Sequence, residues 1–234
     1  MKRKVTLMLS LLIIVQVSCK KDVSDLDILA ETITIDGTLY TTVAIGTKTW
    51  TASNYNGVGG VNYKDGVNDP FLGKLYSWPE IKAIANLPKG WRIPTEADVK
   101  SLMTLVGTKV DLTQTYTDAT SCAKLISTTG WTNVLYTGLN TTKLNLHPTG
   151  YLSISALGTK TFSDKGIRAS FWTSTTVQSG GKYLPLLFEI STSSVDARNQ
   201  PAGLRGGIYS TTANGDGVTT MLAEKRSLRF VKDN

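Results

Sequence analysis

The first part of the domain predicts β-hairpins, because it contains two β-rich runs, the first of which alternates Thr and Ile with a period of two. The segments 32–35 and 39–45 are rich in Thr, Val and Ile, and Asp36-Gly37 stands between them. This dipeptide favours the tight turn that joins two antiparallel strands. A second Gly-containing turn follows, and we expect a third strand at 49–51.

The period changes to that of a helix between residues 95 and 106. The apolar residues there recur at positions i, i+3, i+4 and i+7, and they are Val99, Leu102, Met103 and Val106. This spacing places them on one face of a helix. Acidic residues follow Thr95 in the first turn, so we predict Thr95 as the N-cap and Gly107 as the residue after the helix end.

The rest of the chain predicts two shorter helices and several short strands. One helix begins near Pro79 and buries Ile81, Ile84 and Ala85, and the other spans 119–127. The candidate strands are 142–146, 150–154, 170–175, 183–190 and 228–231, with a long loop at 203–217. We therefore predict a single α+β domain over 32–234, with antiparallel strands, two to three short helices and a long-loop region.

The first eighteen residues have the pattern of an export signal. Three basic residues at 2–4 precede a largely apolar segment at 5–17, which is shorter than the roughly 20 residues of a membrane-spanning helix. Val17-Ser18-Cys19 then resembles the lipobox of bacterial lipoproteins, although Gln16 stands where an aliphatic residue is usual.

The lipobox resemblance implies that 1–18 is removed and that Cys19 becomes the lipidated N-terminus, anchored in the outer membrane. Residues 19–31 would then be a flexible tether. The alternative is an ordinary cleaved signal with a chance cysteine. The charged residues at 20–22 fit either a surface-export signal or a plain polar tether.

Composition and charge exclude several classes of protein. The chain has 234 residues, of which 41% are hydrophobic, so it can bury a sizeable core and is not disordered. The net charge of +7 falls to +4 without the three signal-peptide cations, and no dense Lys/Arg run remains to bind nucleic acid. Two Cys and one His exclude a multi-disulfide scaffold, a zinc finger and a His-rich metal site.

A set of short motifs in fixed order carries a family resemblance across essentially all of 38–233. The motifs are Ile45-Gly46-x-x-x-Trp50 with Asn54, Gly73-x-Leu75-Tyr76-x-Trp78, LPKGWRIPT at 87–95, Ala123-Lys124-Leu125-x-Ser127-x-x-Gly130-Trp131, Pro148-x-Gly150-Tyr151, Phe171-Trp172-x-Ser174-Thr175 and RFVKD at 229–233. Together they resemble the Fibrobacter succinogenes major paralogous domain. All five Trp residues lie within them, and we expect these side chains to be core landmarks.

The segment 91–106 is also similar to formylglycine-generating enzymes and, more remotely, to C-type lectins. This similarity implies a C-type-lectin-like architecture in which the final strand returns beside the first. The Fibrobacter succinogenes major paralogous domain usually has Cys at the two positions where this chain has Leu87 and Phe230. That resemblance therefore implies an apolar contact between these side chains in place of a disulfide. Cys122 would then be a buried, unreactive thiol.

None of the catalytic arrangements that we considered finds support in the residues. The formylglycine-generating chemistry needs later cysteines, and a Ser-His-Asp triad would need His147, which we interpret as a partly buried strand-end residue. Paired glycosidase carboxylates are harder to exclude, because separation in space cannot be read from the sequence. No metal or other cofactor is predicted. Calcium at 214–217 is the alternative to an ordinary turn there.

We therefore predict a lipid-anchored cell-envelope protein with a non-catalytic binding or adhesion domain, for a glycan or another surface protein. The alternatives are a structural envelope component without a small ligand and, third, a carbohydrate-active enzyme. Loops between 176 and 220 are the predicted contact surface, since long loops on a rigid scaffold often carry recognition. The candidate ligand-binding residues are Arg198, Asn199, Gln200, Tyr209 and Asp216.

Overall fold

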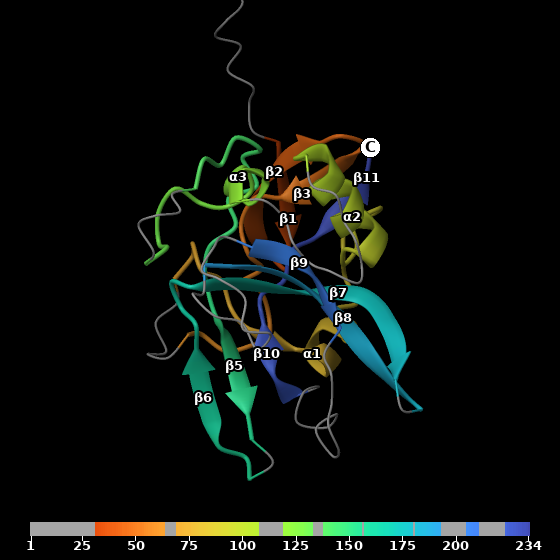
Figure 1. Cartoon of the computed structure of the whole chain (residues 1–234). Coiled ribbons are helices and arrows are strands. Elements are labelled where there is room, and N and C mark those ends of the chain that lie inside the picture. The colour runs from red at the N-terminus through yellow and green to blue at the C-terminus, as the bar shows by residue number, and fades with distance from the viewer. Residues whose placement is uncertain are drawn as a thin grey trace, which may run out of the picture.

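The protein is built from antiparallel strands and short helices, as the computed structural model shows (Figure 1). The structure describes residues 31–63, 69–107, 119–132, 138–155, 157–179, 181–192, 205–210 and 223–234. The strands are β1 (Thr32–Ile35), β2 (Thr38–Ile45), β3 (Lys48–Thr51), β4 (Tyr76–Ser77), β5 (Tyr151–Ile154), β6 (Lys160–Ser163), β7 (Arg168–Ser179), β8 (Lys182–Ser191), β9 (Arg205–Ser210), β10 (Lys225–Arg226) and β11 (Val231–Asp233). The helices are α1 (Trp78–Lys82), α2 (Glu96–Leu105) and α3 (Ala119–Ala123). This content confirms the α+β class.

Within the described residues the strands form three sheets. The first has the order β1-β2-β3-β11, so the last strand of the chain lies antiparallel to β3 in the sheet that the amino-terminal hairpins begin. The second has the order β4-β10-β5-β6, and the third is the long hairpin of β7 and β8 with β9 beside it. The final strand therefore returns to the sheet that contains the first strand, but it lies beside β3 and not, as expected, beside β1, which is at the opposite edge.

The predicted hairpin turn is present at Asp36-Gly37. Both residues have positive φ, 48° and 74°, which is the backbone that this dipeptide adopts readily in a two-residue hairpin. The predicted cap of α2 is also present, because the Thr95 hydroxyl accepts a hydrogen bond from the Asp98 amide at 3.2 Å. Gly107 follows the helix end with φ of 100°.

Asp98 links the start of α2 to two strands of the first sheet. Its carboxylate is buried, accepts from the Thr95 amide at 2.7 Å, and forms ion pairs with Arg92 and with Lys48 of β3. Arg92 and Lys48 also reach Asp233 of β11. Although burial opposes it, the hydrogen bonds from Arg92 and Thr95 hold the pKa of Asp98 well below its usual value.

Several sequence expectations were wrong in extent. Segment 142–146 is not a strand, because Lys143 and Asn145 have positive φ and the segment turns. The loop expected at 203–217 contains β9, and the contact loops expected from 176 onward begin with strands β7 and β8. In the described segments β6 and the two-residue strands β4 and β10 were not predicted.

The other two predicted helices are shorter than expected. The first, α1, ends at Lys82, so Ile84 and Ala85 lie beyond it, and Ile84 packs against the core from there. The third, α3, ends at Ala123, and Ile126 instead bridges Leu146 in an isolated β-bridge. The strand expected at 228–231 begins only at Val231.

The described core consists of two clusters. One is built around Trp50, the apolar stripe of α2 and the inner faces of β7 and β8, and Cys122 is fully buried in it. The other is mostly aromatic and contains Trp78, Trp91, Trp172 and Phe230. Four of the five Trp side chains are thus buried and the fifth, Trp131, packs against the first cluster, which confirms them as core residues. Leu87 packs against the cluster that contains Phe230; their direct contact stays a prediction.

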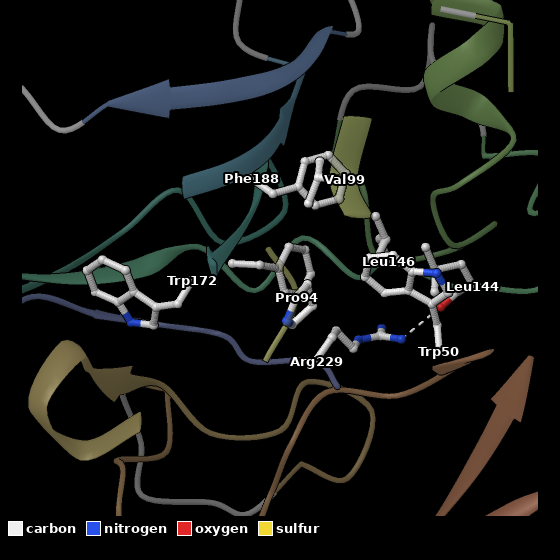
Figure 2. Close-up of a pocket in the computed structure, with 9 residues that line it drawn as sticks. Trp50, Pro94, Val99, Leu144, Leu146, Trp172, Phe188 and Arg229 are labelled. Atoms are coloured by element: carbon white, nitrogen blue, oxygen red, sulfur yellow. Dashed lines mark hydrogen bonds between the residues drawn. The ribbon is translucent and has the colours of Figure 1, made fainter. Parts of the chain in front are cut away.

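Arg229 lies between these clusters without a carboxylate partner among the described residues. Its Nε donates to the Asn54 side chain at 2.6 Å, and its two Nη atoms donate to the carbonyl groups of Thr51, Leu144 and Asn145 at 2.7, 2.8 and 2.9 Å. Figure 2 shows the side chain pointing toward Leu144 and Trp50. Burial lowers the pKa of Arg229 to about 9, so the group remains charged at neutral pH.

We expect Arg229→Met to destabilise the fold by about 3 kcal/mol or more, because it leaves several buried acceptors without donors. Urea unfolding of the variant measures this loss. Lys100→Met is the control: its ion pair with Glu96 is on the surface, so its removal should cost less than about 1 kcal/mol. Equal losses for the two variants would contradict the role assigned to Arg229.

Candidate ligand-binding pocket

The best candidate site is an open pocket of about 400 Å³ beside the only His of the chain. Its size falls in the range of pockets that bind small ligands, roughly 300–1,000 Å³. The lining residues come from four separate segments, which form three walls, and are Asp69, Phe71, Leu72, Thr129, Gly130, Asn145, His147, Pro148 and Lys165. By contrast, the cavity drawn in Figure 2 between the two core clusters is about 10 Å³, which leaves room for at most one water molecule.

The first wall is a turn that Asp69 organises. Its Oδ1 accepts from the backbone amides of Phe71 and Leu72 at 2.9 and 3.3 Å, and its carbonyl oxygen accepts from Gly73 at 2.9 Å. A side chain at Gly73 would meet the Tyr55 carbonyl at 2.7 Å, so the turn requires glycine here. The turn presents the Phe71 ring to solvent with 67% of its surface exposed.

The second wall is the segment from Asn145 to Pro148. Arg229 holds its start through the Asn145 carbonyl, and the Asn145 amide donates to the Asn140 side chain at 2.9 Å. His147 is 8% exposed, and its Nε2 lies 3.1 Å from the Asn145 side-chain nitrogen. The Phe71 ring lies 6.2 Å from the imidazole, centroid to centroid, so the two walls bring two rings to one opening.

The third wall combines Thr129 and Gly130 with Lys165. The Gly166 amide donates to the Pro148 carbonyl at 2.9 Å, which joins this wall to the second one. The Lys165 ammonium lies 5.2 Å from the centre of the Tyr63 ring, and that ring packs against Phe162. A cation over an aromatic face is held there by the ring quadrupole. The pocket is thus bordered by rings as well as by polar groups.

His147 is neutral in this setting. Burial is the main cause, and Arg229 adds to it, so that the pKa of His147 falls to about 4 against the opposing attraction of Asp69. Because the side-chain amide nitrogen of Asn145 can only donate, Nε2 of His147 is the acceptor and Nδ1 of the same ring carries the proton. The pocket therefore offers a neutral ring donor, amide groups, hydroxyls, one carboxylate and one ammonium, a set that can bind a polar ligand.

Of the residues that the sequence nominated for ligand binding, the structure describes only Tyr209. Arg198, Asn199, Gln200 and Asp216 lie outside the described residues, as do Cys19 and the calcium alternative at 214–217. Tyr209 lies in β9, where its backbone is opposite Leu187. Among the described residues no cluster of His, Cys, Asp and Glu could hold a metal ion.

Sequence reasoning singled out His147 but did not place it in a pocket. It is buried and not partly buried as expected, and it stands in an irregular segment and not at the end of the strand predicted at 142–146. The available signal was the single His next to the Pro148-x-Gly150-Tyr151 motif. Asp69 and Phe71 carried no such signal, because neither belongs to a motif.

The lowered pKa of His147 predicts a pH dependence of stability. The unfolded chain takes up the proton on this imidazole near pH 6.5, and the folded chain only near pH 4. The contribution of His147 to the free energy of unfolding is therefore fully present above about pH 7 and is lost as the pH falls. We expect His147 to account for about 2 kcal/mol of loss between pH 7 and pH 5. Urea unfolding of wild type and His147→Gln at both values isolates this contribution. A similar loss in the variant would contradict it.

Comparison with known proteins gives one match. The model of the Fibrobacter succinogenes major domain family matches residues 43–200, which is more than half of the chain. No curated protein and no solved structure matches the chain. Within the described residues, no helix is both long and apolar enough to cross a membrane. The motif order and the family match agree, and the chain belongs to the Fibrobacter succinogenes major domain family.

Proposed function

We propose that this protein is a lipid-anchored component of the cell envelope whose domain binds a glycan without catalysis. The observation that carries the binding part is the exposed Phe71 ring at the mouth of a polar pocket. The anchoring part rests on the Val17-Ser18-Cys19 motif, and the outer membrane is the proposed location. A C-type-lectin-like architecture belongs to the same proposal, supported by the return of β11 to the first sheet.

The pocket suits a sugar because it combines a flat apolar surface with polar groups in fixed positions. The C–H face of a pyranose ring is apolar and packs on aromatic rings, while its hydroxyls need donors and acceptors at the edge. Phe71 supplies the ring, and Asn145, His147 and Thr129 supply the polar groups. A neutral imidazole donates to a hydroxyl without the desolvation cost of a charged group.

Binding is favoured over acid–base catalysis by the state of these groups. A general base is most effective when its pKa lies near the working pH, and the pKa of His147 lies near 4. The Asp69 carboxylate already accepts two amide hydrogen bonds that form its turn. These groups are therefore arranged to hold a ligand in place.

We expect Phe71→Ala to weaken glycan binding by tenfold or more, because covering this ring with a ligand contributes about 1.5–3 kcal/mol. Calorimetric titration of the purified chain against a panel of polysaccharides and their oligomers measures this change. Tyr183→Ala is the matched control, since Tyr183 is 66% exposed and does not line the pocket.

Three outcomes oppose this proposal. If Tyr183→Ala weakened glycan binding equally, the contact surface would have to include the β7–β8 hairpin. Absence of binding across the panel would favour the structural envelope role. Release of shortened oligomers from a panel member would favour the carbohydrate-active enzyme.

The anchor has a separate test. We expect Cys19→Ser to move the chain from the membrane fraction to the soluble fraction, because several acyl chains each contribute about 0.8 kcal/mol per buried methylene. Mass spectrometry of the native amino terminus checks the modification itself. A mature terminus without acyl groups, or a terminus that does not begin at Cys19, would contradict anchoring and leave the pocket proposal standing.

A further inference from the structure

Strand β2 is longer than its neighbour β1, which leaves part of one edge open. Strand β1 pairs with Thr38–Thr41 of β2, whereas β3 pairs with Thr42–Ile45 on the opposite edge. The Thr42 amide still donates to the Glu31 carbonyl at 2.7 Å, and its hydroxyl donates to the same oxygen at 2.9 Å. The ladder thus continues to Glu31, the first described residue. In the described part of the chain no strand covers this edge beyond that point.

A groove of about 810 Å³ runs beside this open edge. Its lining includes Glu31 and four consecutive residues of β2, Thr41 to Ala44, and it continues across the sheet to Thr49 of β3 and Lys232 of β11. Lys143 and Lys232 add two positive charges to it. Figure 1 shows β1 and β2 at one end of the molecule with β11 in the same sheet, so the groove lies where the chain enters the domain.

We propose that residues 25–30 of this chain enter the groove, and that residues 28–30 extend β1 along β2. The register of the hairpin fixes how they would pair, because Thr32 is opposite Thr41 and each further step adds one residue on each strand. Ala30 then lies opposite Val43, Leu29 opposite Ala44 and Ile28 opposite Ile45. The occupant is covalently attached at the rim of the groove, which favours it over any separate partner.

The sequence of this segment matches the two faces of the sheet in that register. Side chains alternate along a strand, so Asp25, Asp27 and Leu29 share a face with Glu31, and Ile28 and Ala30 take the other. Strand pairing places Ala44, Thr49 and Lys232 in one row across the first face. The acidic residues therefore share the face that carries a lysine.

The opposite face favours the apolar residues of the segment. Val43 and Ile45 pack there against the core cluster that contains Trp50. Ile28 and Ala30 would join them, whereas a slip of one residue would place the aspartates beside Val43 and Ile45 and the isoleucine on the face of Ala44, Thr49 and Lys232. Both faces thus select the same register.

This docking shortens the tether. Twelve residues separate Cys19 from Glu31, a reach of about 40 Å when extended, whereas six residues from Cys19 to Asp25 reach only about 20 Å. The domain would stand close to the membrane with the end that carries the first sheet toward it. This consequence rests on the proposed lipidation of Cys19; the docking itself does not.

Disulfide trapping in the full chain tests the docking. In a Cys19→Ser background, Leu29→Cys is combined either with Ala44→Cys, its proposed partner, or with Leu39→Cys as the control. Ala44 and Leu39 are both exposed on β2, and Leu39 is already opposite Thr34. We expect the first pair to oxidise within one molecule about tenfold faster or more, because docking raises its effective concentration.

Equal rates for the two pairs, or a faster control pair, would overturn the docking. Disulfide-linked dimers as the main product of the first pair would assign the groove to a second copy of the chain and would equally overturn it. Neither result bears on glycan binding at Phe71, so the failure of one proposal does not decide the other.

A hydrogen-exchange measurement gives a readout that needs no cysteine. The Ala44 amide points to the same edge as that of Thr42, and in the proposed register Ala44 and Leu29 exchange both hydrogen bonds. We expect the Ala44 amide to exchange slowly in wild type. It should also exchange slowly in Ala30→Pro, because the amide that this variant loses faces away from β2. In Leu29→Pro we expect exchange to be about tenfold faster or more. Fast exchange of Ala44 in wild type would overturn the proposal.

Discussion

A buried guanidinium must find hydrogen-bond acceptors, and Arg229 imposes that constraint on the centre of this protein. Its acceptors come from β3, from Asn54 after it, and from the segment that follows Asn140, which are far apart in the sequence. These acceptors are carbonyl and amide oxygens, so the described structure satisfies the charge with dipoles of fixed position. The first sheet, the final strand and the pocket wall can therefore take up only a narrow range of relative positions.

The pocket depends on this constraint because the segment that leads into its second wall has an unfavourable backbone. Asn140, Lys143 and Asn145 all have positive φ, which costs free energy for residues other than glycine. The bonds from Arg229 to the Leu144 and Asn145 carbonyls offset part of that cost. Burial is the main cause of the lowered pKa of His147, and the same cation adds to it, so this side chain supports the shape of the wall and helps to keep its imidazole neutral.

Sequence reasoning succeeded where a local signal decides the structure. Asp36-Gly37 determines a turn, and Thr95 with the apolar stripe of α2 determines a helix, whatever lies around them. It failed at 142–146, where a β-like composition yields to the bonds from Arg229, a residue more than eighty positions away. The pocket was out of reach for the same reason: Asp69, Asn145 and Lys165 meet only through tertiary contacts, so no spacing along the chain relates them.

The two sites share one short segment, and this decides how independent they are. Lys143 lines the groove beside β2, whereas Asn145 and His147 line the pocket, and the carbonyls that Arg229 holds belong to the residues between and beside them. Movement at the groove could reach the pocket only by breaking these buried bonds, each of which would leave an acceptor unsatisfied. To alter the pocket, docking of the tether would have to favour a changed arrangement of this segment by more free energy than the broken hydrogen bonds cost. If residues 25–30 dock as proposed and leave the Arg229 bonds intact, docking would orient the domain relative to its tether without changing the affinity of the pocket.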